Sequence, residues 1–364
     1  MNSSHRMALP SGYADSRERF RVLGARLGGE PRCFYHDEEA SGSPRLSTDT
    51  VYLGPARADT LVVIASGTHG VEGYAGAMCQ LRLLEAYPAR FADRGIACLL
   101  AHALNPWGYL HDSRVTPEGV DLNRNFVDFP VTDADPCGYG DYHALLVSRF
   151  RPLPGGLWNE LRFLAYGLTR QRRRALQAAI TAGQYTYPDG LFFGGAVPTR
   201  SRLVWEEIVR TYAHGRQRVF LLDLHTGLGR RGTGELISHL PPAHADFRRM
   251  SAWFGDTVRS AAGGQSVSAA LAGTLTAAFG RAVAGTSYAL GLEFGTRSPL
   301  VVLNALRADQ WWRNHAARVT PRQRERVRRK MKAAFAVPDR AWAEQVAVRF
   351  DEVIGQLADA LADE

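Results

Sequence analysis

The chain has 364 residues, of which 45% are hydrophobic and 22% are charged, the composition of an ordinary globular protein. No apolar run approaches the roughly 18 residues that a membrane helix needs, and the N-terminal segment lacks the apolar core of a signal peptide. The cysteines are scattered without C-x-x-C spacing, at Cys33, Cys79, Cys98 and Cys137. We therefore expect a cytoplasmic protein without disulfides and without a membrane partner.

A net charge of +8 raises the question of a nucleic-acid partner. Much of the positive charge lies in two segments of helical pattern, 171–174 and 322–332. No recognised nucleic-acid-binding motif accompanies this charge. We interpret both segments as solvated basic faces of helices and expect no nucleic-acid partner.

Residues 1–30 are predicted to form a loose arm containing a short helix over Ser16–Leu27. Apolar and β-branched runs predict strands at Arg32–Tyr35, Thr50–Leu53, Thr60–Ala65, Ile96–Ala103, Arg218–Leu224, Glu235–His239 and Thr286–Phe294. Helical periodicity predicts helices at Tyr74–Tyr87, Trp158–Ala182, Ala243–Ala262, Pro299–Arg318, Arg322–Phe335 and Ala341–Ala362. Residues 130–156 and 185–195, rich in turn-forming residues, are predicted as loops.

Alternating strands and helices predict an α/β layer fold with a central mixed sheet flanked by helices. With no polar linker between the motifs, we expect one domain over 1–364. A helical and loop insertion is expected at 130–217, and the C-terminal part, 298–364, is expected to be helical.

His69 and Glu72 form an H-x-x-E motif directly after the apolar run that ends at Ala65. Open α/β sheets place ligand sites where their strands end. Imidazole and carboxylate are the donors of catalytic zinc, which takes three protein ligands and keeps a position for water. Taken alone, the motif also fits a surface His and Glu in a polar turn.

A second apolar run, Val219–Leu224, leads to His225 and supplies a third ligand of the right type. Asp223 alternates with His225, so the two side chains are expected on one face of the strand. Asp223 is either an orienting partner of His225 or a buried, paired carboxylate.

Asn123 and Arg124 follow the strand-like residues Val120, Asp121 and Leu122. An amide next to a planar guanidinium suits the capture of a carboxylate. A metal-ligand set and a carboxylate clamp in one chain indicate hydrolysis of a bond near a carboxylate.

The ordered motifs THGVE, VDLNRNF, DLHTG and LEFGT resemble those of the zinc carboxypeptidase superfamily, which includes aspartoacylase and succinylglutamate desuccinylase. The chain is most similar to a bacterial branch with SGTHGVEG, NPWG, GQYTYPDG and LHTGLG. The resemblance covers roughly residues 50–300. It implies the fold of that superfamily and one Zn²⁺ per chain.

The resemblance also implies roles for individual residues. It makes His69, Glu72 and His225 the zinc ligands, and Glu293 the general base. Further implied roles are carbonyl polarisation by Arg114, carboxylate binding by Asn123 and Arg124, and orientation of His69 by Asp121.

One departure from the peptidase pattern concerns a tyrosine. The segment Ser268–Thr274, before Glu293, lacks the mobile Tyr that peptidases of the superfamily carry there. Tyr185, Tyr187 and Tyr288 are the substitutes that the sequence offers.

The sequence therefore predicts a zinc-dependent hydrolase that cleaves an amide bond next to a carboxylate in a small substrate, such as a short peptide. An N-acyl amino acid deacylase, similar to aspartoacylase, is the alternative. A non-catalytic metal- or ligand-binding protein on the same fold is the rival from another class, but such a protein would not need the general base Glu293.

Overall fold

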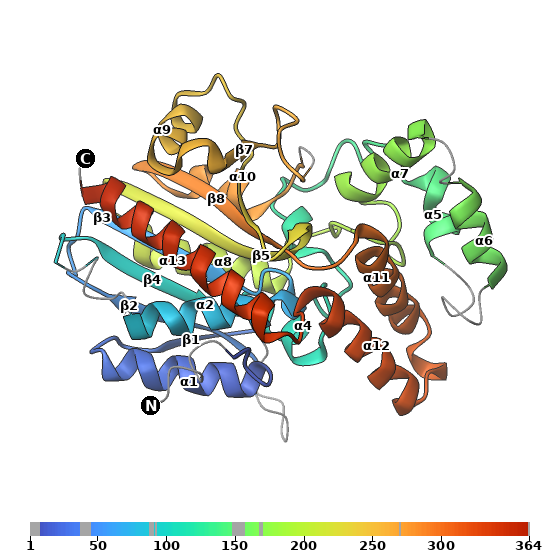
Figure 1. Cartoon of the computed structure of the whole chain (residues 1–364), viewed down its shortest axis with the longest axis horizontal. Helices are drawn as coiled ribbons and strands as arrows, with labels where there is room; N and C mark the ends of the chain where they lie inside the picture. The colour runs from blue at the N-terminus through green and yellow to red at the C-terminus, as the bar shows by residue number, and fades with distance from the viewer. Residues whose placement is uncertain are drawn as a thin grey trace.

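The computed structural model describes residues 8–36, 45–86, 91, 93–147, 157–166, 170–268 and 271–362. Residues 1–7 of the predicted arm lie outside these ranges. Within the described residues, eight strands form one sheet in the order β1-β2-β4-β3-β5-β8-β6-β7 (Figure 1). The strands are β1 (Arg32–Tyr35), β2 (Ser47–Leu53), β3 (Thr60–Ser66), β4 (Ala97–His102), β5 (Arg218–Arg231), β6 (Gly234–Ser238), β7 (Val258–Ser260) and β8 (Thr286–Gly295).

The four central strands of the sheet are parallel, and the strand next to them on each side is antiparallel. Strands β4, β3, β5 and β8 run in the same direction, whereas β2 and β6 run against their neighbours β4 and β8. The mixed α/β sheet expected from the sequence is confirmed. Because the four central strands are parallel, their carboxyl ends all meet at one edge of the sheet.

Helices cover both faces of the sheet. Side chains alternate along β3, so Val62 and Ile64 join one apolar core while Leu61 and Val63 join another. The first core is shared with α1 (Tyr13–Arg26), α2 (Gly73–Ala86), α9 (Ala245–Phe254) and α13 (Arg340–Ala362). The second core is shared with α8 (Arg200–Ala213) and α10 (Leu275–Phe279).

A third group of helices lies beside the carboxyl ends of the central strands (right side of Figure 1). Its members are α4 (Pro106–His111), α5 (Gly140–Leu146), α6 (Leu157–Tyr166), α7 (Arg170–Ala182), α11 (Pro299–Asn314) and α12 (Pro321–Phe335). Short 3-10 helices occur at Gly70–Glu72, Leu122–Arg124, Gly255–Thr257, Gly280–Ala282 and Ala316–Arg318. The helical C-terminus expected from the sequence is confirmed by α11, α12 and α13.

Several element predictions were wrong. The predicted loop 130–156 contains α5. Backbone amides at the start of this helix donate hydrogen bonds to the side chain of Asp135, which lies before the helix. The helix predicted over Ala243–Ala262 ends at Phe254, because Gly255 (φ 65°) turns the chain into β7. Helix α8 was not predicted.

Strand β5 also runs further than predicted. It continues past Leu224 to Arg231 because β8 stays paired with it: Gly227 and, after a register shift, Arg231 both pair with Gly295. His225 therefore lies inside a paired strand rather than after one. The single helix predicted over 158–182 corresponds to α6 and α7, with 167–169 outside the described residues.

Within the part of the chain that the structure describes, no helix combines the length and the apolar character that a membrane span requires.

Candidate metal centre and its cleft

The turn after β3 carries His69 and Glu72 and is closely packed. Gly70 approaches Gly108 so closely that an added Cβ would lie 2.0 Å from the Gly108 carbonyl carbon. Backbone bonds from Gly70 to Arg114 (3.3 Å) and from Val71 to Ser113 (2.9 Å) tie the turn to the loop after α4. Only glycine allows this approach, and it fixes both predicted ligands at the edge of the sheet.

His69, Glu72 and His225 come together as predicted. One candidate ligand atom from each side chain lies within 4.8 Å of the others, and all three residues are buried. Nδ1 of His69 lies 3.0 Å from Oε1 of Glu72, and Nδ1 of His225 lies 3.1 Å from Oε2 of the same carboxylate. Among the described residues, Nδ1 of His69 has no hydrogen-bond partner. Two imidazole nitrogens directed at one buried carboxylate fit the donor set of zinc.

Each imidazole is held from behind by an aspartate. Nε2 of His69 lies 3.1 Å from Oδ1 of Asp121, and Nε2 of His225 lies 2.6 Å from Oδ2 of Asp223. The other oxygen of Asp223 accepts a hydrogen bond from Thr68 (2.8 Å). When Nε2 of His225 donates to Asp223, its Nδ1 carries the free lone pair that a metal requires. Nε2 of His69 also lies 2.8 Å from Nη2 of Arg114, which can only donate. Asp223 thus contacts His225 in the way that the orienting alternative expects.

The electrostatic balance keeps the ligand carboxylate ionised. Burial alone would raise the pKa of Glu72, but His69, His225 and Arg114 outweigh it and hold this pKa well below its usual range. Burial alone would lower the pKa of His225, but Asp223 and Glu72 raise it well above its usual value. Because a metal ligand must be deprotonated, protons compete with a metal for His225.

Arg114 lies among the ligands. Its Nε donates to Oδ2 of Asp121 (3.0 Å) and its Nη1 donates to Oε1 of Glu72 (3.0 Å). Burial would lower the pKa of Arg114, but these carboxylates raise it. The guanidinium lines the cleft, as the sequence predicts. A metal ion bound to Glu72 would compete with the ion pair between Arg114 and Glu72.

Glu293 stands beside the ligands on β8. It is the strand partner of His225, and its Oε1 accepts a hydrogen bond from the backbone amide of Leu228 (2.8 Å). Burial, together with the charge of Glu72, raises the pKa of Glu293 to about 7. A carboxylate with this pKa exchanges protons readily near neutral pH, as a general base must.

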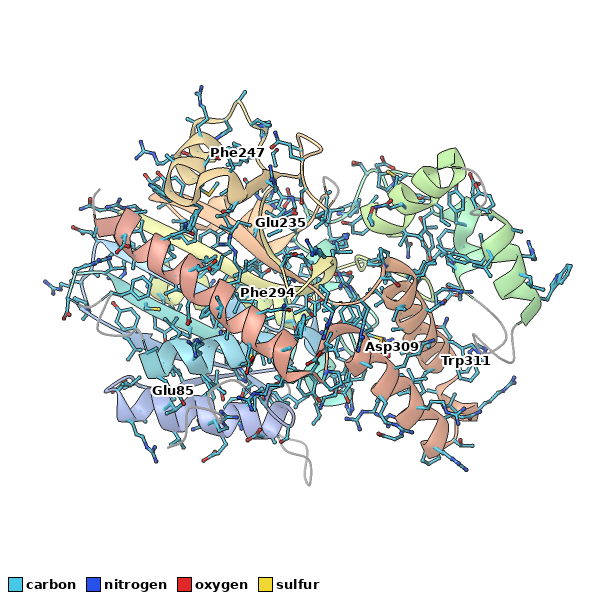
Figure 2. The ribbon with its side chains drawn as sticks, in the orientation of Figure 1. Glu85, Glu235, Phe247, Phe294, Asp309 and Trp311 are labelled. Carbon is cyan, nitrogen blue, oxygen red and sulfur yellow. The ribbon has the colours of Figure 1, made fainter. Side chains whose placement is uncertain are left out.

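The neighbouring strand β6 pairs Glu235 with Glu293 (Glu235 is labelled in Figure 2). Glu235 has a different environment. It accepts hydrogen bonds from Ser266 (2.6 Å) and from the backbone of Val267 (3.0 Å), and it is not part of the cleft lining. We interpret it as a structural carboxylate.

Asn123 and Arg124 line the same cleft. Oδ1 of Asn123 accepts from the backbone of Leu275 (2.8 Å), which fixes the side-chain amide. Arg124 is only 3% exposed and donates to the carbonyls of Asn123 (2.7 Å) and Thr181 (2.6 Å). Its Nε is buried without a hydrogen-bond partner among the described residues, and burial lowers its pKa. A buried guanidinium with an unused donor is suited to bind an anion.

No tyrosine belongs to the described lining of the cleft. Tyr185 donates to the carbonyl of Arg124 (2.7 Å) and Tyr187 stacks on His143. Tyr288 is buried in the core against Trp253. None of the three substitutes offered by the sequence therefore reaches the cleft in this structure.

The cleft also contains residues that the sequence reasoning did not select. The lining includes Thr181, Phe192, Ile237, His239 and Leu271. Burial, followed by the charges of Arg124 and His225, lowers the pKa of His239 to about 4. Two of them had a signal in the sequence: Phe192 lies in the aromatic, glycine-rich loop 185–195, and Leu271 lies in the segment Ser268–Thr274.

A family model described as "Protein of unknown function (DUF2817)" matches residues 10–349. The chain belongs to the DUF2817 family. No curated protein matches this DUF2817 chain.

Solved structures show the fold of this DUF2817 chain. Thrombin-activatable fibrinolysis inhibitor is 12% identical, with a TM-score of 0.56 over all of this chain and 77% of that chain. Carboxypeptidase A from Helicoverpa armigera is 13% identical, with a TM-score of 0.47 over 89% of this chain and 74% of that chain. A metallo-carboxypeptidase from Burkholderia cenocepacia is 12% identical, with a TM-score of 0.41 over 82% of this chain and 67% of that chain. At these identities the likeness concerns the fold alone, and the first match supports a carboxypeptidase-like fold. The expected fold is confirmed.

Proposed function

We propose that this chain is a zinc-dependent hydrolase that cleaves an amide bond next to a free carboxylate in a small substrate. The observation that carries the proposal is the meeting of three groups in one cleft. They are the His69–Glu72–His225 cluster, the buried carboxyl of Glu293 and the buried guanidinium of Arg124. A pure metal-binding protein would need the first group but neither of the other two.

Zinc, when bound, would act as a Lewis acid and make water easier to deprotonate. In this proposal Glu293 takes a proton from water and delivers it to the leaving nitrogen, which its raised pKa favours. Arg114 stabilises negative charge that develops on the scissile carbonyl oxygen. Asn123 and Arg124 hold the substrate carboxylate and so fix the distance from that carboxylate to the bond that breaks.

Short peptides and N-acyl amino acids both present a carboxylate at the required place. The carboxypeptidase-like fold of the chain supports a peptide substrate. The absence of a tyrosine from the described cleft lining distinguishes this site from the superfamily's peptidases and supports the alternative, deacylation of N-acyl amino acids.

The test is a turnover screen of the zinc-loaded protein against dipeptides and N-acyl amino acids, read by mass spectrometry. Each substrate is offered as the free acid and as its amide, with Glu293→Gln as the matched inactive control. We expect turnover of free acids by the wild type alone. Equal product from wild type and Glu293→Gln would contradict the proposal, and zinc binding without any turnover would favour the binding-protein alternative.

A further inference from the structure

Phe192 lies in the cleft with a strained backbone. Its φ of 53° is in the left-handed region, which bulky side chains rarely adopt. Strain of this kind persists only where the surrounding structure fixes it, and it gathers at functional sites. The function proposed above gives Phe192 no role, so the strain needs another explanation.

Hydrogen bonds fix the backbone on both sides of Phe192. Its own carbonyl accepts from the amide of Gln184 (3.2 Å), and the carbonyl of Phe193 accepts from the amide of Asp121 (2.8 Å). The side chain of Gln184 also donates to the carbonyl of Leu191 (3.3 Å). Asp121 is the carboxylate that holds His69, so the loop that carries Phe192 is tied directly to the candidate metal centre.

The ring of Phe192 lies beside the guanidinium groups of Arg114 and Arg124. The ring centroid lies 5.3 Å from the guanidinium carbon of Arg114 and 5.8 Å from that of Arg124. Both distances allow a favourable cation–π interaction. The same ring lines the cleft, so it is a wall that a bound substrate would touch.

The surroundings of Arg124 close the cleft on that side. The carbonyl of Thr181 holds one guanidinium nitrogen, and Gly183 packs against the stem of the side chain, where an added Cβ would lie 2.6 Å from Cδ. Phe192 covers the guanidinium as well. A carboxylate bound to Arg124 would therefore lie among these groups, next to the ring of Phe192.

We propose that Phe192 is a specificity-determining residue that keeps water and bulky groups away from the two guanidinium groups. The inference rests on the proposed function and narrows its substrate class. Because Arg114 and Arg124 hold the scissile carbonyl and the carboxylate, the ring packs along the stretch between them. The favoured substrates are compact acids whose carboxylate is terminal, and carboxyl amides, esters and chains extended beyond that carboxylate are rejected.

The test compares four variants by the ratio of kcat/KM for a free acid to that for its amide. Phe192→Leu keeps an apolar wall without an aromatic face, whereas Phe192→Ala and Phe192→Gly remove the wall. We expect a loss of about twofold to thirtyfold on the free acid in Phe192→Leu, the value of a cation–π contact. A larger fall in the acid-to-amide ratio is expected for Phe192→Ala and Phe192→Gly, because water then reaches Arg124. Ala103→Gly, which changes another residue with positive φ (61°) outside the cleft lining, is the control and should keep the ratio.

Thermal unfolding separates this role from a structural one. Glycine adopts positive φ without strain, so Phe192→Gly should melt above Phe192→Ala while both lose discrimination equally. If discrimination instead follows stability, or stays at the wild-type ratio in both variants, Phe192 is only a packing residue and the inference is wrong.

Calorimetry gives a readout that does not depend on turnover. The probes are an N-acetyl amino acid and its amide, each titrated into the zinc-loaded wild type and into Phe192→Leu. A binding preference of the wild type for the acid that weakens in Phe192→Leu supports the inference. If the wild type shows this preference but hydrolyses neither probe, the proposed hydrolase function is wrong and the inference about Phe192 still holds. Equal preference in both proteins overturns the inference.

Discussion

His225 on β5 and Glu293 on β8 are direct partners in the parallel register of the central sheet. Paired residues on adjacent parallel strands project to the same face, so a candidate ligand and a candidate base stand side by side. The same register pairs Asp223 with Gly291, where an added Cβ would meet only His225 (3.9 Å) and a backbone oxygen (4.0 Å). On this face of the sheet the candidate ligand His225, its partner Asp223 and the candidate base Glu293 therefore lie in adjacent positions, with open space above Gly291.

Zinc content should depend on the buried histidines. Protein purified without added metal is expected to carry about one zinc per chain, and His69→Ala should lose most of it, because zinc needs three protein ligands at such a site. Elemental analysis measures this. His214→Ala, an exposed histidine, is the control. Full zinc content in His69→Ala would rule out the ligand assignment.

Replacing the base should separate chemistry from binding. Glu293→Gln keeps the acceptor for Leu228 and is expected to keep zinc and fold while kcat falls roughly 10²–10⁴-fold. The matched control is Glu235→Gln, which changes the strand partner of Glu293 on β6 and should keep most of the activity. Steady-state kinetics measures both variants. Near-normal kcat in Glu293→Gln would remove Glu293 from the mechanism.

The carboxylate clamp can be tested with a double-mutant cycle. Arg124→Ala, or amidation of the substrate carboxylate, should each cost about 2–5 kcal/mol in kcat/KM, because each leaves a buried charged partner unpaired. The two changes together should cost little more than either alone. If the two losses of kcat/KM are independent and additive, Arg124 binds some other part of the substrate.

The aspartate behind His225 should tune metal affinity. Asp223→Asn is expected to weaken zinc binding roughly 10–100-fold, because the amide no longer fixes the Nε2–H tautomer or makes the imidazole more basic. Competition with a chelator measures this affinity. Asp189→Asn, which changes the exposed partner of His143, is the control and should bind zinc like the wild type. Unchanged affinity in Asp223→Asn would make Asp223 a packing residue.

Buried Asp309 on α11, labelled in Figure 2, should make stability depend on pH. Burial raises its pKa from 3.8 to about 6, and repulsion from Asp112 adds to this. The hydrogen bond from Ser113, the charge of Arg313 and the backbone amide of Arg114 oppose the rise. A raised carboxyl pKa means that the fold favours the neutral form. The resulting stabilisation is complete below about pH 4 and is lost as the pH rises through 6.

Asp309→Asn removes this titration and keeps an acceptor for Ser113. Relative to the variant, the wild type should lose roughly 3 kcal/mol between pH 4 and pH 7, from a shift of about 2 pKa units. Denaturant unfolding at a series of pH values measures the difference. A difference that does not change with pH would show that Asp309 is not titrating in this range.

The fold class and the candidate ligands could be predicted from the sequence for a local reason. Strands β3 and β5 each contain a continuous apolar run, Leu61–Ala65 and Val219–Leu222, and residues that follow such a run are expected near the carboxyl edge of a parallel sheet. His69 and Glu72 follow β3, and Glu293 lies near the end of β8, whereas His225 lies inside β5, which continues to Arg231. The motifs were therefore enough to predict that these four residues meet in one site.

The tertiary structure alone decided the features that depend on contacts between distant segments. The sequence leaves two interpretations of Asp223 open, and only the structure shows that its carboxylate lies 2.6 Å from Nε2 of His225. The length of β5 depends on its pairing with β8. The start of α5 depends on hydrogen bonds from its backbone amides to Asp135, which lies before the helix. The role that we propose for Phe192 depends on the backbone amides of Gln184 and Asp121, whose hydrogen bonds hold its loop beside Arg114 and Arg124. Local sequence patterns report periodicity and chemistry, whereas burial, register and strain are properties of the packed molecule.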